Sequence, residues 1–265
     1  MVEDFENEFE SPFLERKFAY RAFAPKGFKN EVRTLPVLYL LHGLFGEMGN
    51  WAQLTKIKSY LKSNNFVVVM PNAGDYWYTD SAVNKKARFE TFFVNEFFNA
   101  VEKELNIGKC RAQRAIAGIS MGGYGAIKFG LKNPEYFCFI GSMSGALNAP
   151  AICEKNIKKG QEELLPSLRF AFGNASEIGN TQNNLFEIVR NLSDQERKTL
   201  PNIYLDCGTK DSFLIDNIRF FELLRDKKIS AEFEIVNGSH DWGYWNKRLE
   251  IVLTKAKQVF ENDKH

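Results

Sequence analysis

Histidine is scarce in this chain, where only His42, His240 and His265 occur among the 265 residues. So few histidines argue against a histidine-rich metal site, and the four cysteines form neither a C-x-x-C pair nor a metal-ligand spacing. Glycine fingerprints for dinucleotides or for nucleotide phosphates are also absent. The sequence therefore predicts a protein that needs no metal and no cofactor.

A large excess of one charge and long apolar runs are missing as well. The net charge is only +2, and lysine and arginine are interspersed with acidic residues, which argues against a nucleic-acid partner. No apolar run approaches the ~20 residues of a membrane span. The acidic start lacks a basic segment followed by an apolar one, so we expect no signal peptide and a cytoplasmic protein. The oligomeric state, including a homo-oligomer, stays open.

Apolar residues, by contrast, are well organised along the chain. Hydrophobic residues make up 44% of it, and several continuous apolar runs are typical of parallel strands buried on both faces. We expect an edge strand at 18–23, further strands at 37–41, 66–70, 114–117, 137–140, 203–207 and 232–236, and helices at 50–64, 89–105, 123–127, 213–226 and 242–260. This alternation predicts an α/β protein with a mostly parallel sheet and helices on both faces.

One segment interrupts this alternation. Residues 147–200 are polar, contain several glycines and asparagines, and show one helical stretch near 185–191. We interpret them as a cap-like insertion over the functional site rather than a second domain. The chain is therefore expected to form a single domain over 1–265.

The most informative motif is Gly118-Ile119-Ser120-Met121-Gly122, between an apolar run and a small-residue helix. A G-x-S-x-G in this context is the nucleophile elbow of α/β-hydrolases. The serine occupies a strained turn, so side chains two residues away on either side would collide with the neighbouring strand and helix. The motif predicts an α/β-hydrolase fold with Ser120 as nucleophile.

A serine nucleophile needs a general base, and histidine is the usual one. His240 follows the last expected strand and precedes the last expected helix, which is where this fold places its base. His42 follows an early strand, in the position of the oxyanion loop, and His265 is the last residue. We therefore predict that His240 is the base.

The orienting acid should follow the next-to-last strand, giving the chain order serine, aspartate, histidine. Asp211 lies just past the expected strand 203–207 and is our prediction. Asp206 is the rival, although it falls inside that strand, where a buried carboxylate would need its own partner. Asp216 would lie on the following helix, and Asp241 adjoins the base too closely to reach its ring.

The oxyanion hole needs two N–H groups aimed at the developing negative charge. Met121, directly after the nucleophile, is expected to supply one of them. Leu44 is our choice for the other, with Gly43 or Phe45 as alternatives.

Substrate-binding residues are expected near the predicted triad and oxyanion hole. Residues 71–80 form a dense aromatic loop after a buried strand, and such a loop forms either a pocket wall or a cover for the edge of the core. From this loop, the oxyanion loop and the helix after the elbow, we select Trp77, His42 and Tyr124 as candidate substrate-binding residues.

The sequence contains five motifs that are considered in combination: His42-Gly43-Leu44, the stretch 71–78, the elbow with its continuation Gly123-Tyr124-Gly125, the stretch 207–211, and His240-Asp241-Trp242. The combination resembles an esterase family that includes esterase D, tributyrin esterases, feruloyl esterases and the antigen 85 mycolyltransferases. The resemblance extends from about residue 16 to 260 and is nearest to the tributyrin esterase branch. S-formylglutathione hydrolases differ, since they typically carry histidine where Tyr124 stands.

The residues and the resemblance agree on Ser120, His240 and Asp211 as a catalytic triad, with Leu44 and Met121 at the oxyanion hole. We therefore predict a serine carboxylesterase that hydrolyses short-chain acyl esters of small molecules through an acyl-enzyme. The alternatives are a feruloyl or acetyl-xylan esterase and an S-formylglutathione hydrolase. An acyltransferase and a non-catalytic binding relative are further alternatives.

Overall fold

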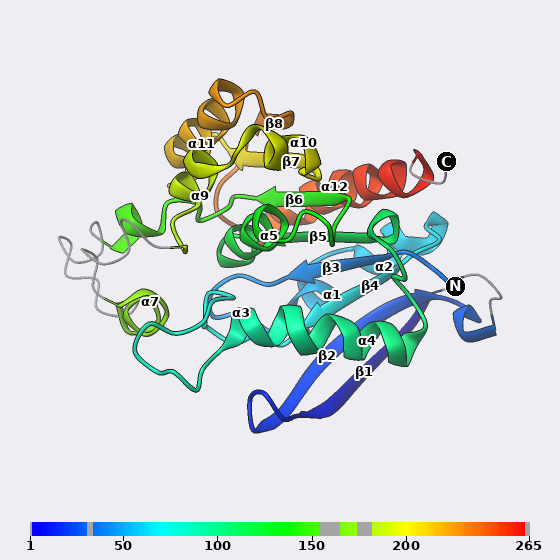
Figure 1. Cartoon of the computed structure of the whole chain (residues 1–265). Helices are drawn as coiled ribbons and strands as arrows, with labels where there is room; N and C mark the ends of the chain where they lie inside the picture. Colours follow the sequence, from blue (N-terminus) through cyan, green and yellow to red (C-terminus); the bar gives the residue numbers. More distant parts are fainter. Residues whose placement is uncertain (1, 31–33, 154–164, 174–181, 263–265) are drawn as a thin grey trace.

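A computed structural model of the protein describes residues 2–30, 34–153, 165–173 and 182–262. Within these residues one sheet contains eight strands in the order β1-β2-β4-β3-β5-β6-β7-β8 (Figure 1). The strands are β1 (Val2–Ser11), β2 (Arg16–Pro25), β3 (Val37–Leu41), β4 (Val67–Pro71), β5 (Arg114–Ile119), β6 (Phe139–Met143), β7 (Asn202–Gly208) and β8 (Ala231–Val236).

The sheet is parallel from β4 to β8, and only β1 and β2 run antiparallel to their neighbours. The predicted mostly parallel sheet is therefore confirmed. The prediction that 18–23 is an edge strand is wrong, because β1 pairs along the whole of β2 and forms the edge instead. In β1, Phe5 and Phe9 pack against the core while the acidic residues between them are more exposed, a period-2 pattern that the high charge conceals.

Helices cover both faces of the sheet, as predicted. They are α1 (Asn50–Leu54), α2 (Ile57–Tyr60), α3 (Phe89–Phe92), α4 (Phe98–Leu105), α5 (Met121–Lys132), α7 (Leu165–Phe172), α9 (Leu185–Asn191), α10 (Asp194–Thr199), α11 (Leu214–Asp226) and α12 (Trp242–Asn262). A π-helical turn at Phe93–Phe97 joins α3 to α4, and short 3₁₀ turns occupy Phe28–Asn30, Leu61–Ser63 and Arg111–Gln113. In Figure 1, α4 and α5 lie in front of the sheet and α12 lies behind it.

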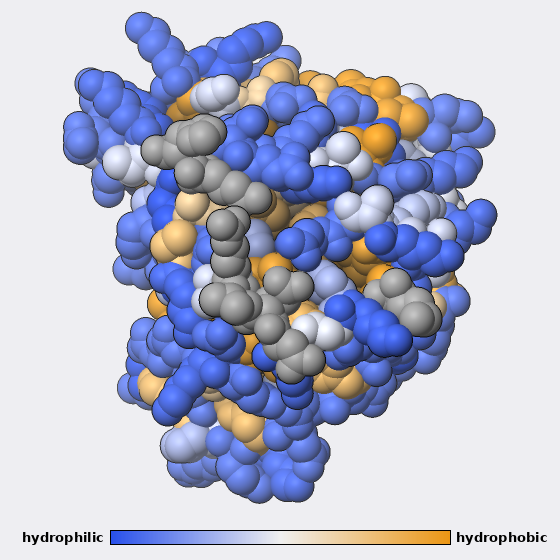
Figure 2. Space-filling model, turned by 90° about the vertical axis from the view of Figure 1, so that its right-hand side faces the viewer, coloured by the Kyte–Doolittle hydropathy of each residue, from blue (hydrophilic) through white to orange (hydrophobic). Residues whose placement is uncertain are grey.

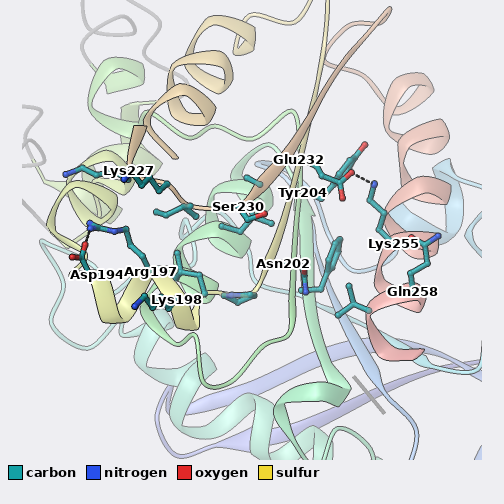
Figure 3. A pocket seen from close by; sticks show the side chains of 18 residues that line it. Asp194, Arg197, Lys198, Asn202, Tyr204, Lys227, Ser230, Glu232, Lys255 and Gln258 are labelled. Carbon is teal, nitrogen blue, oxygen red and sulfur yellow. Dashed lines mark hydrogen bonds and ion pairs between the residues drawn. The ribbon is translucent and has the colours of Figure 1, made fainter. Parts of the chain in front are cut away.

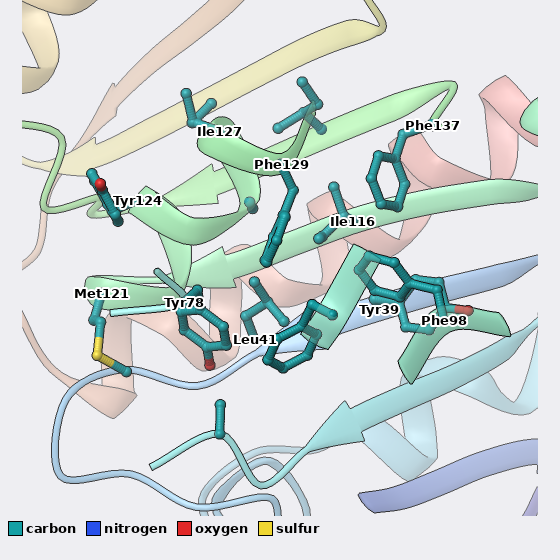
Figure 4. Packing of buried hydrophobic residues seen from close by; sticks show 14 of the residues in the cluster. Tyr39, Leu41, Tyr78, Phe98, Ile116, Met121, Tyr124, Ile127, Phe129 and Phe137 are labelled. Atoms are coloured by element: carbon teal, nitrogen blue, oxygen red, sulfur yellow. The ribbon is translucent and has the colours of Figure 1, made fainter. Parts of the chain in front are cut away.

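Alternate residues of each buried strand enter different cores. Tyr39 and Leu41 of β3 join the cluster under α3, α4, α5, α9 and α11, which contains many aromatic rings (Figure 4). Leu38 and Leu40 join the cluster under α1, α2 and α12. A continuous apolar strand is thus explained, because each of its faces is covered by helices.

Two predicted helices differ from the structure. The helix expected at 89–105 is present, but it contains the π turn, which places Phe93 and Phe97 in the core. The helix expected at 50–64 is broken into α1, α2 and a 3₁₀ turn, and the break falls at Thr55, whose backbone is extended.

The segment 147–200 is only partly described. Its predicted helical stretch is α9, and the structure adds α7 and α10, which sequence periodicity did not reveal. Residues 154–164 and 174–181 of the predicted insertion lie outside the described residues. The described parts bring Ile152 and Leu168 to the cavity discussed below.

The surface of the protein is predominantly hydrophilic where Figure 2 shows it. On that face hydrophobic residues appear in small groups between hydrophilic ones. Among the described helices, none combines the length and apolar character required to cross a bilayer.

Candidate active site

The turn between β5 and α5 places Ser120 at the carboxyl edge of the sheet. Ser120 has φ 52° and ψ −117°, a backbone conformation that L-residues rarely adopt. A Cβ at Gly118 would lie 2.5 Å from the backbone of Gly122, and one at Gly122 would lie 2.5 Å from the Leu41 carbonyl oxygen. Both glycines of the motif are therefore required by close backbone contacts.

The structure brings Ser120, His240 and Asp211 together although they are far apart in the sequence. The Ser120 Oγ lies 3.0 Å from His240 Nε2, and His240 Nδ1 lies 2.9 Å from Asp211 Oδ2. The imidazole is also held edge-on between Phe213 and Trp245, with ring centroids 5.0 and 4.9 Å away. The order hydroxyl, imidazole, carboxylate is the geometry needed to draw a proton from the serine.

The carboxylate of Asp211 is kept ionised by its neighbours. Burial raises the pKa of this carboxyl, but the hydrogen bond and charge of His240 and the Phe213 N–H hold the pKa below its ordinary value. That Phe213 N–H donates to Asp211 Oδ1 at 2.9 Å, which leaves Oδ2 for the imidazole. Asp211 therefore remains an acceptor at neutral pH.

The rival carboxylates face other partners. Asp206 is buried within β7 and accepts from Tyr244, while Asp216 on α11 accepts from Asn148. Asp241 accepts the Tyr244 N–H at the start of α12. The three rivals thus have other described partners, whereas Asp211 contacts His240 Nδ1 at 2.9 Å.

The oxyanion loop, residues 42–46, lies against the nucleophile. A Cβ at Gly43 would lie 3.3 Å from Ser120 Cβ, so this loop approaches the serine closely. The Phe45 N–H donates to Asp75 at 2.6 Å, which removes Phe45 from the alternatives for the second oxyanion donor. Met121 is the first residue of α5, so its N–H lacks an intrahelical acceptor.

A cavity of about 510 Å³ surrounds these groups. Its lining is mainly aromatic and aliphatic, with polar contributions from Ser120, His240, Asn50 and Asp241. The apolar side chains are Leu44, Phe45, Trp77, Ile119, Ala146, Ile152, Leu168, Phe213, Trp242 and Trp245. A mostly apolar cleft with a few convergent polar groups is typical of a small-molecule site.

Of the three candidate substrate-binding residues, only Trp77 lines this cavity. Tyr124 is fully buried and its hydroxyl donates to the Asn183 carbonyl oxygen. His42 is also buried, and both ring nitrogens are bonded to the backbone, at Gly43 and at Ala73. We correct the assignment of His42 and Tyr124 accordingly, because their polar atoms are already satisfied inside the protein.

A larger cavity of about 610 Å³ lies at the amino ends of β6, β7 and β8 (Figure 3). Ser120, in contrast, follows the carboxyl end of β5. The larger cavity is lined by charged groups such as Arg197, Lys198 and Lys255 and contains neither serine–histidine pair nor cysteine. No cluster of three or more histidine, cysteine, aspartate or glutamate side chains suited to a metal ion occurs in the part of the chain that the structure describes.

A family model described as "Putative esterase" matches residues 11–255 of the chain. The chain belongs to this esterase family. An acetyl esterase of Caldicellulosiruptor saccharolyticus is 30% identical over 261 residues, which are 95% of this chain and 97% of that protein. The resemblance seen in the sequence is therefore confirmed at the level of the family.

Solved structures resemble the esterase over nearly its whole length. A ferulic acid esterase is 28% identical with a TM-score of 0.83, covering 97% of this chain and 99% of that one. FphF, a fluorophosphonate-binding serine hydrolase of Staphylococcus aureus, is 24% identical with a TM-score of 0.84, covering 96% and 98%. These similarities confirm the predicted α/β-hydrolase fold, and the family establishes the esterase as a carboxylic ester hydrolase.

The sequence did not single out several residues of this esterase that line the cavity. Ile152 and Leu168 belong to the segment 147–200, which has no periodic pattern that would orient them. Trp242 and Trp245 line the cavity as well. Their position beside His240 was the only available signal.

Proposed function

We propose that this esterase hydrolyses short-chain acyl esters with Ser120 as nucleophile, His240 as general base and Asp211 as the residue that orients the imidazole. The observation that carries the proposal is the pair of contacts of 3.0 Å and 2.9 Å that join the three side chains in that order. The cavity around Ser120 supplies a place for the ester.

The reaction follows from these contacts. The Ser120 Oγ bonds to the ester carbonyl carbon while its proton passes to His240 Nε2, and the carbonyl electrons move onto the oxygen. Collapse of this intermediate breaks the bond to the alcohol, which leaves with the proton from His240. Water then repeats both steps on the acyl-enzyme and releases the carboxylic acid. The N–H groups of Met121 and Leu44 are proposed to stabilise the oxyanion.

The lining of the cavity supports a short acyl group. The indole of Trp77 and the branched side chains of Ile152 and Leu168 occupy space next to the nucleophile. Because the cavity must hold both the acyl and the alcohol portions, little length is left for a fatty chain. Ile152 and Leu168 also support a cap-like role for the described part of the segment 147–200 within a single domain.

A panel of p-nitrophenyl esters from acetate to laurate tests this proposal. Acetate to butyrate esters are expected to exceed laurate in kcat/KM by at least about tenfold, which corresponds to ~1.4 kcal/mol. The Ser120→Ala variant is expected to lose turnover by roughly 10⁴-fold while folding normally. A maximum at laurate would refute the short-chain specificity, and substantial turnover by the alanine variant would refute the nucleophile.

A feruloyl ester is the second candidate, favoured by the aromatic lining. Trp77, Phe213, Trp242 and Trp245 surround the nucleophile and could stack on an aromatic acid. One of the solved structures that resemble this esterase, at 28% identity, is a ferulic acid esterase. Release of ferulate from methyl ferulate at a rate comparable to acetate release would favour this candidate over the first.

A further inference from the structure

The aromatic loop, residues 71–80, is bound to the oxyanion loop by hydrogen bonds at three points. They are Phe45 N–H to Asp75 Oδ1 at 2.6 Å, Tyr78 O–H to the His42 carbonyl oxygen at 3.0 Å, and Ala73 N–H to His42 Nε2 at 3.1 Å. From the sequence, this loop was predicted to form either a pocket wall or a cover for the edge of the core. These bonds show that it also supports the oxyanion loop from behind.

The oxyanion loop contains a strained turn. The Gly46 N–H donates to the Gly43 carbonyl oxygen at 3.1 Å and closes a four-residue turn with Leu44 and Phe45 at its corners. Phe45 has φ 58°, whereas Leu44 has no positive φ, and these φ signs match a type II turn. Glycine normally occupies the third position of such a turn, so a phenylalanine there needs compensating interactions.

The direction of the Leu44 N–H is set by the carbonyl on the other side of its peptide bond. The Gly43 carbonyl oxygen accepts from the Gly46 N–H at 3.1 Å and from His42 Nδ1 at 2.8 Å. The peptide is trans, so the Leu44 N–H points away from these two donors. Gly43 lies against Ser120, so the Gly43–Leu44 peptide is next to the nucleophile.

The His42 ring is fixed in one protonation state by the same contacts. Its Nδ1 faces a carbonyl oxygen and must carry the proton, whereas its Nε2 faces the Ala73 N–H and must accept. Burial lowers the pKa of His42, against the Gly43 carbonyl and the charges of Asp75 and Glu47, which raise it. A neutral His42 therefore serves as a structural link between the two loops.

We propose that Asp75 is a positioning residue for the esterase reaction, because its carboxylate holds the strained turn at Phe45 in the form that presents the Leu44 N–H to the oxyanion. This inference rests on the proposed function. Without the carboxylate, the Leu44–Phe45 peptide is free to flip to a type I turn, in which Phe45 adopts the negative φ that it prefers. The flip changes ψ of Leu44 and φ of Phe45 and releases the turn from Asp75, so the adjoining Gly43–Leu44 peptide, which carries the Leu44 N–H, is held less firmly in place.

The primary test compares Asp75→Ala with the parent on p-nitrophenyl acetate. We expect kcat to fall by about 10- to 100-fold with KM changed less than about threefold, because the donor matters most in the transition state. A trifluoromethyl ketone, which forms a tetrahedral adduct on serine, should bind more weakly by a similar factor. Asp75→Asn keeps an acceptor oxygen and should recover most of the loss. Asp80→Ala is the matched control, since Asp80 lies in the same loop but accepts from Thr91.

A double-mutant cycle with Phe45→Gly separates positioning from a general structural role. Glycine adopts positive φ without steric cost, so the turn should keep its form without the carboxylate. Asp75→Ala in the Phe45→Gly background should therefore lose less than about threefold relative to Phe45→Gly alone. Comparing the double variant with Phe45→Gly still tests the inference if Asp75→Ala alone fails to fold.

The inference would be overturned if Asp75→Ala kept the kcat of the parent or changed only KM. It would also be overturned if Asp75→Ala lowered kcat by the same factor in the Phe45→Gly background, or if Asp80→Ala lowered kcat as much as Asp75→Ala does. Failure of the proposed function would look different, because the parent itself would then show no turnover that depends on Ser120.

Discussion

The Tyr244 hydroxyl donates a 2.8 Å hydrogen bond to Asp206, and Arg248 Nε lies 3.3 Å from the same carboxylate. Burial raises the pKa of Asp206 to about 6, although Arg248 and Tyr244 act to lower it. Asp206 therefore links β7 to α12. Asp211, only five positions later, instead contacts His240.

Asparagine substitutions at the two aspartates should separate catalysis from stability. Asp211→Asn is expected to lower kcat by roughly 10³- to 10⁴-fold with little change in unfolding, because the imidazole loses its orienting anion. Asp206→Asn should keep turnover within a few-fold but lower the free energy of unfolding by roughly 2 kcal/mol, since buried Arg248 loses one carboxylate partner. Steady-state kinetics and denaturant unfolding of both variants check this. The opposite pattern would assign the acid to Asp206.

Strain at the nucleophile leads to a second prediction. Ser120 has φ 52°, which L-residues avoid and glycine adopts readily. Ser120→Gly should therefore be more stable than Ser120→Ala by about 1 kcal/mol, while both variants are inactive. Thermal unfolding of the two variants side by side measures the difference. Equal stability would mean that the elbow stores no backbone strain at this position.

The sequence predicted the parts of this protein that depend on local pattern. Buried parallel strands are continuous apolar runs, and the elbow glycines follow from backbone contacts that any such turn requires. Strand β1 was missed because its alternating acidic residues resemble a charged terminus, and only pairing with β2 shows that Phe5 and Phe9 face the core.

Contacts between residues far apart in the sequence could not be predicted either, because local sequence patterns do not show which distant residues meet. The His42 ring looked like a candidate for substrate contact, because nothing local reveals that Ala73 and Gly43 satisfy both of its nitrogens. Similarly, Asp75 appeared only as one polar residue in an aromatic loop. Its partner Phe45 is thirty positions away, so no spacing rule connects them.

The described part of the segment 147–200 leads to a third prediction, on acyl length. Leu168→Ala removes a buried side chain from the cavity wall and should raise the laurate-to-acetate ratio of kcat/KM by at least about fivefold. Leu185→Ala is the matched control, because Leu185 is buried in the same segment but does not line the cavity. Both variants should lose stability, but only Leu168→Ala should change specificity. An unchanged ratio would place the acyl chain elsewhere.

A buried lysine should make stability depend on pH in the alkaline range. Lys128 is fully buried on α5, with its Nζ 3.1 Å from Glu90, and Lys132 binds the same carboxylate. Burial lowers the pKa of Lys128 from 10.5 to about 8, although Glu90 and Asp80 act to raise it and Lys132 lowers it further. The folded protein thus releases this proton at a lower pH than the unfolded chain does.

The sign of the effect follows from proton binding. Between about pH 8 and 10.5 the unfolded chain binds the proton and the folded protein does not, so the free energy of unfolding rises with pH. The expected rise between pH 7.5 and 9.5 is roughly 2 kcal/mol. Lys128→Met should abolish this rise, whereas Lys132→Met should retain most of it, because burial, the largest cause of the lowered pKa of Lys128, is still present in that variant. Denaturant unfolding of the parent and both variants between pH 7.5 and 9.5 measures this rise. If the free energy of unfolding changed equally with pH in the parent and in Lys128→Met, Lys128 would stay charged in the folded protein.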